Sequence, residues 1–389
     1  MPSLRPDLDP DGLLEFSVVF TDRSLNHMSQ AFQGVMRDIH ATLCEVHKAS
    51  RAVLVPGGGT YAMEAVARQF ATGAKVLVIR NGLFSYRWSQ IFQAGGIPKH
   101  ETVLKARRTG EGPKAPFAPP PIEEVVRAIA AERPDVVFAP HVETASGMIL
   151  PEAYIRAVAD AVHAVGGLFV LDGVASGCVW VDMAALEVDV LLSAPQKGWS
   201  ASPSAGMVML RDEALARCRA AASTSFALDL GRWLAIMEAY LGGGHAYHAT
   251  MPTDAIRGLR DAMLEAKAFG FDRLEEAQWA QGRAVRALLA ERGIASVAAD
   301  GFAAPGVVVA YTDDPEVQSG RRFAQQGLQI AAGVPLMVDE GPDFRSFRLG
   351  LFGLDKLKDV PASVARFEAA LDRVFPGERA KSSGQAQTA

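Results

Sequence analysis

The residue with the clearest chemical potential in this 389-residue chain is Lys197. It follows an apolar run, 188–192, that is broken only by Asp189 and predicts a buried strand. A second apolar run, 167–171, ends in Asp172. Open α/β sheets hold their chemistry just beyond the carboxyl ends of strands, and a buried lysine is costly unless it is paired, neutral or covalently used. Pyridoxal phosphate (PLP) would use both side chains, because the lysine forms a Schiff base and the acid keeps the pyridinium nitrogen protonated.

A glycine-rich turn, Gly57-Gly58-Gly59-Thr60, lies between a predicted strand at 52–55 and a predicted helix at 62–70. Glycines let backbone N–H groups approach an anion, and Thr60 adds a hydroxyl at the start of the helix. A purely structural turn is an equally compatible reading. The pattern is neither GxGxxG nor a Walker A motif, which disfavours nucleotide binding.

Three further segments place polar or aromatic residues near this position. In the segment 141–147, which follows a predicted strand, Thr144 could donate a hydrogen bond to a cofactor phenolate oxygen. The segment 81–88 also follows a strand and carries aromatic residues that could stack on a planar ring. Arg348 lies inside the apolar alternation 344–352, and its guanidinium suits bidentate carboxylate capture. The structural alternatives are a capped loop, a core aromatic and a local ion pair, respectively.

Composition narrows the class of protein. The chain is 49% hydrophobic and 21% charged, which is typical of a globular enzyme, and its net charge of -5 argues against nucleic-acid binding. The three cysteines are too few and too scattered for a disulfide framework, and no CxxC pair suggests a metal site. We find no signal-peptide pattern and no apolar run of about 18 residues, so we expect a cytoplasmic protein without a membrane segment.

Strand-like and helix-like stretches alternate along the first two thirds of the chain. The predicted strands are 52–55, 75–79, 135–139, 168–171, 188–192 and 206–210, followed later by 306–311 and 346–351. The predicted helices are 26–48, 62–70, 84–93, 122–131, 152–165, a long region 252–292, 316–326 and 360–374. This alternation predicts an α/β fold with a mostly parallel sheet between helices. We divide the chain into an N-terminal segment 1–25, a large domain 26–255, a small α+β domain 256–376 and a disordered tail 377–389.

The motifs, taken together, resemble the class V, fold-type I PLP enzymes, and among them the alanine–glyoxylate and serine–glyoxylate aminotransferases. The resemblance runs from about Asn26 to Val374. It depends on HxETxSG at 141–147, DGVAS at 172–176 and SxxQKG at 193–198, with further matches at 247–250 and 347–350. It implies a large PLP-binding domain with a mostly parallel, seven-stranded-type sheet and a smaller C-terminal α+β domain.

The resemblance also implies a role for each matching residue. Lys197 would be the Schiff-base lysine and proton shuttle, and Arg348 would bind the substrate carboxylate. Around the cofactor ring, Asp172 would pair with the pyridinium nitrogen, Val174 would lie under the ring, Thr144 would donate to the phenolic oxygen and Phe84 would be the stacking aromatic. The phosphate would be held by Gly58, Gly59, Thr60 and Gln196, while Tyr247 and Thr250 would reach the phosphate of a neighbouring subunit. A homodimer with shared active sites follows from the role of Tyr247 and Thr250. No metal is implied.

The implied activity is transfer of the amino group of alanine, serine or aspartate to glyoxylate or pyruvate. The sequence departs from the family by lacking a Pro-Gly-Pro-like segment near its start, by Thr60 where some relatives have His, and by Phe84 where Trp is usual. Tyr86, Arg87 and His141 are candidate selectors of the substrate side chain.

Two alternatives stay open. One is a PLP-dependent lyase of the same fold, such as a cysteine desulfurase or another β-lyase. A desulfurase needs a nucleophilic cysteine near the small domain, yet no cysteine lies beyond Cys218, and Phe84 stands where His is usual. The other alternative is a non-catalytic nucleotide-binding protein, which would leave Lys197 unexplained.

Overall fold

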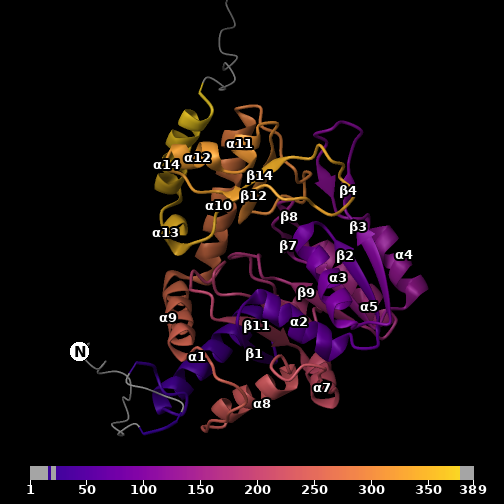
Figure 1. The fold of residues 1–389 in the computed structure, drawn as a ribbon, viewed down its shortest axis with the longest axis vertical. Helices are drawn as coiled ribbons and strands as arrows, with labels where there is room; N and C mark the ends of the chain where they lie inside the picture. The colour runs from indigo at the N-terminus through magenta and orange to yellow at the C-terminus, as the bar shows by residue number, and fades with distance from the viewer. Residues whose placement is uncertain (1–15, 19–22, 377–389) are drawn as a thin grey trace, which may run out of the picture.

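The computed structural model describes residues 16–18 and 23–376 (Figure 1). Most of the predicted N-terminal segment 1–25 and all of the predicted tail 377–389 lie outside the described residues. The described chain forms a seven-stranded sheet with helices on both sides, and a three-stranded sheet with its own helices, drawn in orange and yellow. The predicted α/β class is therefore confirmed, whereas the limits of the two domains stay a prediction.

The large sheet has the strand order β1-β11-β10-β9-β6-β2-β3. Its strands are β1 (Arg51–Pro56), β2 (Lys75–Arg80), β3 (His100–Lys105), β6 (Val136–Pro140), β9 (Leu168–Asp172), β10 (Val190–Ser193) and β11 (Ala205–Leu210). Neighbours from β10 to β3 are parallel, whereas β11 is antiparallel to both β1 and β10. Every residue of β6 and β9 is buried, as expected for parallel strands that are covered on both faces.

Helices from the first two thirds of the chain pack around this sheet (Figure 1). They are α1 (Gln30–His47), α2 (Gly59–Phe70), α3 (Leu83–Gly95), α4 (Ile122–Glu132), α5 (Glu152–Ala164), α6 (Met183–Leu186), α7 (Asp212–Ala220) and α8 (Leu230–Leu241). The first begins at its N-cap Ser29, whose side chain accepts a hydrogen bond from the backbone N–H of Phe32. Its buried side chains include Phe32, Met36, Ile39 and Leu43, which recur at helical spacing.

The C-terminal part forms a second, smaller core. Its sheet has the order β12-β14-β13, with β12 (Val307–Tyr311), β13 (Ala331–Ala332) and β14 (Ser346–Gly350). Its helices are α10 (Phe271–Ala290), α11 (Pro315–Gln318), α12 (Arg321–Gln325), α13 (Leu354–Leu357) and α14 (Val360–Val374). The helix before them, α9 (Thr253–Phe269), packs against α1 and buries Ile256, Leu259 and Met263 in the core of the large sheet. Two short ladders, β4–β5 (Arg107–Arg108 and Phe117–Ala118) and β7–β8 (Val142–Glu143 and Met148–Ile149), lie near the junction of the two sheets (Figure 1).

The structure corrects two predicted helices. The region 252–292 is two helices rather than one, because the backbone of Gly270 between them has φ of 105°. The predicted helix 316–326 is likewise split, at Gly320, where φ is 79°. The sequence analysis also missed β3, α7 and α8. The edge strand β3 has no fully buried residue, so it lacks the continuous apolar run that identified the central strands.

A backbone contact positions the turn that carries Lys197. A Cβ atom added to Gly198 would lie 1.9 Å from the carbonyl oxygen of Gly177. Gly177 belongs to the loop that follows β9, and Gly198 belongs to the turn that follows β10. The two turns that leave the central strands are therefore in direct contact, and the lysine and Asp172 are fixed relative to each other.

We predict that Gly198→Ala lowers the free energy of unfolding by about 1–3 kcal/mol, because the new methyl group must displace backbone. Urea unfolding followed by circular dichroism measures the change. The matched control is Gly34→Ala in α1, where an added Cβ meets nothing within 4 Å and should stabilise the helix by about 0.5–1 kcal/mol. Equal stability of Gly198→Ala and the wild type would contradict the proposed constraint.

Candidate active site

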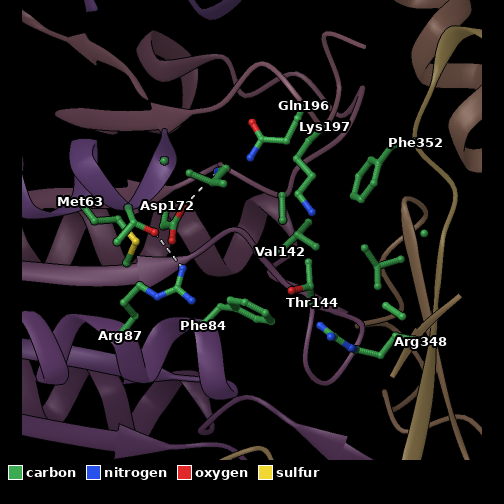
Figure 2. A pocket seen from close by; sticks show the side chains of 17 residues that line it. Met63, Phe84, Arg87, Val142, Thr144, Asp172, Gln196, Lys197, Arg348 and Phe352 are labelled. Carbon is green, nitrogen blue, oxygen red and sulfur yellow. Dashed lines mark hydrogen bonds between the residues drawn. The ribbon is translucent and has the colours of Figure 1, made fainter. Parts of the chain in front are cut away.

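One pocket lies at the carboxyl ends of the central strands, where the small sheet faces the large one (Figure 2). Its volume is about 350 Å³. It is lined by Gly59, Thr60, Met63, Phe84, Arg87, Val142, Thr144, Asp172, Val174, Ala175, Gln196, Lys197, Val307, Ala331, Arg348, Gly350 and Phe352. This is where a doubly wound sheet is expected to hold its ligand.

Lys197 reaches the pocket from the turn after β10. Its Nζ lies 5.1 Å from the centroid of the Phe352 ring, in a cation–π contact. Burial lowers the pKa of this amine below its ordinary value of 10.5, and the positive charge of Arg348 lowers the pKa further. More of the lysine is therefore neutral, which is the form that attacks a carbonyl carbon.

Asp172 is the last residue of β9 and is 7% exposed. One of its carboxylate oxygens accepts a hydrogen bond from the backbone N–H of Val174, at 3.0 Å. Burial raises the pKa of the carboxyl group to about 6, and the nearby Glu143 contributes in the same direction. A cation placed beside this carboxylate would stabilise its charged form, and the protonated ring nitrogen of PLP is such a cation.

The N-terminus of α2 forms another wall of the pocket. The backbone of Gly57 has φ of 123°, and the N-cap is Gly58, which has no side chain that could cap the first N–H groups of the helix. At Gly59 an added Cβ would lie 2.8 Å from a methyl group of Val174, so only glycine allows this close approach. Thr60 follows at the second helical position. Free N–H groups and a hydroxyl at a helix N-terminus suit a phosphate group, so the site fits PLP at both ends.

A buried carboxylate fixes the two residues expected around the ring. Glu143 accepts hydrogen bonds from the backbone N–H groups of Phe84 and Ser85, at 3.2 and 2.8 Å, and from that of Ala145, at 2.9 Å. These bonds connect the start of α3 to the loop that carries Thr144. Burial raises the pKa of Glu143, while the hydrogen bonds oppose that rise.

Arg348 enters the pocket from β14 on the small sheet (Figure 2). Its Nε donates to the carbonyl oxygen of Ala332, at 2.8 Å, and its guanidinium carbon lies 5.5 Å from the centroid of the Phe84 ring. Burial is the main cause that lowers the pKa of this guanidinium, which still carries its charge at neutral pH. The cation therefore stands beside Phe84, in the same pocket as Lys197.

The pocket brings together nine of the predicted site residues: Gly59, Thr60, Phe84, Thr144, Asp172, Val174, Gln196, Lys197 and Arg348. Gly58 is adjacent, as the N-cap of α2. Tyr247 and Thr250 are not among the lining residues. Their hydroxyl oxygens lie 3.2 Å apart, and Tyr247 is 59% exposed. The role of these two residues toward a neighbouring subunit stays a prediction.

The sequence analysis did not assign the other lining residues to the pocket. Arg87 had been considered only as a substrate selector, although its position three residues after Phe84 places both on one face of α3. Phe352 and Gly350 alternate with Arg348, and this period of two was a usable signal. Val307 and Ala331 gave no signal, because they reach the pocket only through the packing of the small sheet onto the large one.

Other site types find no support in the described part of the chain. No group of three or more His, Cys, Asp or Glu side chains there could hold a metal ion. None of the three cysteines lines the pocket, and burial raises the pKa values of Cys178 and Cys218 to about 12, so both thiols stay protonated. Among the described helices, none has both the length and the apolar character needed to cross a membrane.

The fold is that of the fold-type I PLP-dependent enzymes, and the pocket occupies the place where such a sheet holds its ligand. The chain belongs to the aminotransferase class-V family, whose family model matches residues 15–302. The protein is thus a PLP-dependent aminotransferase, which confirms the predicted class of enzyme, fold type and cofactor.

Individual relatives agree with this assignment. The chain is 28% identical, over 350 residues, to a 2-aminoethylphosphonate–pyruvate transaminase of Salmonella paratyphi B, covering 87% of this chain and 89% of the relative. Its fold is similar to that of an alanine–glyoxylate aminotransferase from Nostoc sp., with a TM-score of 0.75, 23% identity, and coverage of 90% of this chain and 88% of the other. An aspartate aminotransferase from Thermus thermophilus matches with a TM-score of 0.73, 25% identity, and coverage of 90% and 93%.

We predict that Arg348→Gln raises the pKa of Lys197, because the variant removes the neighbouring positive charge. The rate at which the apoenzyme captures pyridoxal, measured against pH, reports the neutral amine. Its midpoint should move to higher pH in the variant. Arg345→Gln is the matched control, since Arg345 is exposed and does not line the pocket. An unchanged midpoint in Arg348→Gln would show that the two charges do not interact.

Proposed function

We propose that this aminotransferase moves the amino group of a small anionic donor to a small 2-oxo acid, pyruvate or glyoxylate. The observation that carries the proposal is Arg348. Its only hydrogen bond to the described protein uses Nε, which leaves the Nη atoms free to bind a carboxylate at two points. A transaminase must bind both of its substrates in one site, and one arginine can serve the anionic group of each in turn.

The proposed roles of the large-sheet residues follow from their positions. When bound, PLP supplies the carbonyl group that receives the amine and a ring that accepts electrons. Lys197 moves the proton between the substrate α-carbon and the cofactor, since its lowered pKa increases the fraction of neutral amine that can act as a general base. Asp172 holds the ring nitrogen in its charged form, and Thr144 donates to the phenolic oxygen.

The donors that we propose for testing are alanine, serine, aspartate and 2-aminoethylphosphonate. The first three follow from the aminotransferases that the sequence motifs resemble. The fourth comes from the name of the Salmonella relative, together with the fact that a guanidinium binds a phosphonate as readily as a carboxylate. The apolar walls, including Phe84, Val307 and Phe352, favour a small donor.

We further propose a homodimer with shared active sites. Tyr247 and Thr250 support it, because both hydroxyls belong to an exposed segment after α8 and neither contributes to the pocket of its own chain.

We also propose a reducing compartment, the cytoplasm, which is consistent with three cysteines that are all free thiols.

The proposed activity is tested by absorbance of the PLP-loaded enzyme. The visible band of the lysine-bound cofactor should disappear when a correct donor is added and should return when pyruvate or glyoxylate is added. Each of the four donors is tested separately, so the pair that completes the cycle is the substrate pair. Release of ammonia from the donor, with no need for a 2-oxo acid, would instead establish a lyase.

A second prediction concerns Arg348. Arg348→Gln should raise KM for both the donor and the 2-oxo acid by about 10- to 100-fold, because a charged hydrogen bond contributes about 1.5–3 kcal/mol. The absorbance band of the bound cofactor should not change. Steady-state kinetics of Arg345→Gln provide the control. An unchanged KM for the 2-oxo acid in Arg348→Gln would remove this residue from the substrate site.

A further inference from the structure

A second guanidinium lines the active-site pocket, and the proposed function does not use it. Arg87 belongs to α3, one turn after Phe84, and reaches toward the start of α2 (Figure 2). Its Nη1 donates to the hydroxyl oxygen of Thr60, at 3.1 Å. Its guanidinium carbon lies 5.2 Å from the centroid of the Phe84 ring, so the ring and the hydroxyl together fix its direction.

Arg87 has no carboxylate partner that would neutralise it. Among the described residues it forms no ion pair, and its one hydrogen bond goes to a neutral hydroxyl. The nearby Asp172 feels its charge, since Arg87 acts to lower the pKa of that carboxyl group, but the two make no direct contact. A half-buried guanidinium without a counterion is a site prepared for an anion.

The position of Arg87 in the pocket indicates which anion its guanidinium would bind. The other groups at this end of the pocket are the N-terminus of α2, the Thr60 hydroxyl and the Gln196 amide, none of which carries a full charge. A phosphate monoester carries about 1.5 to 2 negative charges near neutral pH. Because the Thr60 oxygen accepts from Arg87, its hydrogen remains free to donate to a phosphate oxygen.

The other two cations of the pocket are committed elsewhere. Lys197 reacts as a neutral amine, and Arg348 lies on the far side of Phe84, next to the small sheet (Figure 2). Phe84 therefore separates two cationic positions, each within 6 Å of its ring centroid. This separation argues against Arg87 as a selector of substrate side chains.

We propose that Arg87 is the cationic anchor of the cofactor phosphate in this chain. Its guanidinium would bind the phosphate beside Thr60 and the first N–H groups of α2, while Arg348 is left to the substrate anion. The inference rests on PLP being the cofactor and is independent of which donor and 2-oxo acid the enzyme uses.

The test compares two ligands that differ only in the phosphate. Apoenzyme is titrated with PLP and, separately, with pyridoxal, and binding is followed by the absorbance of the lysine-bound form. Arg87→Gln should weaken PLP binding by about 10- to 100-fold and change pyridoxal binding by less than about twofold. Arg87→Lys should retain part of the PLP affinity. Arg87→Met, which keeps the aliphatic stem over Phe84, replaces Arg87→Gln if that variant does not fold.

Arg345→Gln is the matched control, since it removes an exposed guanidinium that does not line the pocket. It should leave PLP affinity within about threefold of the wild type. Inorganic phosphate should compete with PLP for the wild-type apoenzyme and should compete more weakly in Arg87→Gln. Equal weakening of PLP and pyridoxal binding in Arg87→Gln would show that Arg87 only supports Phe84, which contradicts the proposal. Unchanged PLP affinity would also overturn it.

The outcomes also separate this proposal from the proposed function. Neither titration requires turnover, so loss of PLP affinity in Arg87→Gln supports the phosphate anchor even if none of the four donors reacts. Conversely, a complete transamination cycle with unchanged PLP affinity in Arg87→Gln would retain the proposed function and reject the phosphate anchor.

Discussion

The buried carboxylate of Glu143 is the interaction on which the geometry of the pocket depends. It accepts backbone hydrogen bonds from Phe84, Ser85 and Ala145, and so connects the start of α3 to the loop after β6. Hydrogen bonds to a charged group contribute about 1.5–3 kcal/mol each, which is large against the stability of a domain. The approach is close enough that a Cβ on Gly82 would lie 2.6 Å from the Glu143 side chain. The aromatic ring, Thr144 and Arg87 all take their positions from this contact.

The electrostatics of the pocket follow from an excess of positive charge. Three cationic side chains, Arg87, Lys197 and Arg348, face one buried acid, Asp172, whose pKa is itself raised. Burial and, to a smaller extent, the positive charge of Arg348 lower the pKa of the lysine, which is the group that must lose its charge to react. An anionic cofactor and an anionic substrate both relieve the repulsion among these positive charges. The pocket therefore favours anionic ligands of the kind that the chemistry needs.

Much of the fold and the cofactor site could be predicted from the sequence, because the evidence was local. Lys197 and Asp172 each follow a short apolar run that identifies a buried strand, and the carboxyl ends of parallel strands meet at one edge of a sheet. The breaks at Gly270 and Gly320 were missed, because a single glycine does not end an otherwise helical pattern and its positive φ is seen only in the structure. The edge strand β3 was missed because half-exposed strands carry no continuous apolar signal.

The rest could not be predicted because it depends on tertiary packing. Val307 and Ala331 line the pocket only because the small sheet lies over the end of the large one. No periodicity within their own segments specifies that docking. The predicted role of Tyr247 and Thr250 depends on the assembly of subunits rather than on packing within one chain, since their predicted ligand would belong to another subunit.

The division of the site between two sheets separates two properties of the enzyme. The residues proposed to face the cofactor ring and phosphate belong to the large sheet and its helices, whereas Arg348, the proposed ligand of the substrate, and its backbone partner Ala332 belong to the small sheet. If Arg348 binds the substrate as proposed, sequence change in β13, β14 and their loops would alter which acid is accepted while leaving the reactive centre intact. A fold divided in this way can change its substrate while its reaction stays the same, which is a physical reason for one cofactor fold to serve many different transaminations.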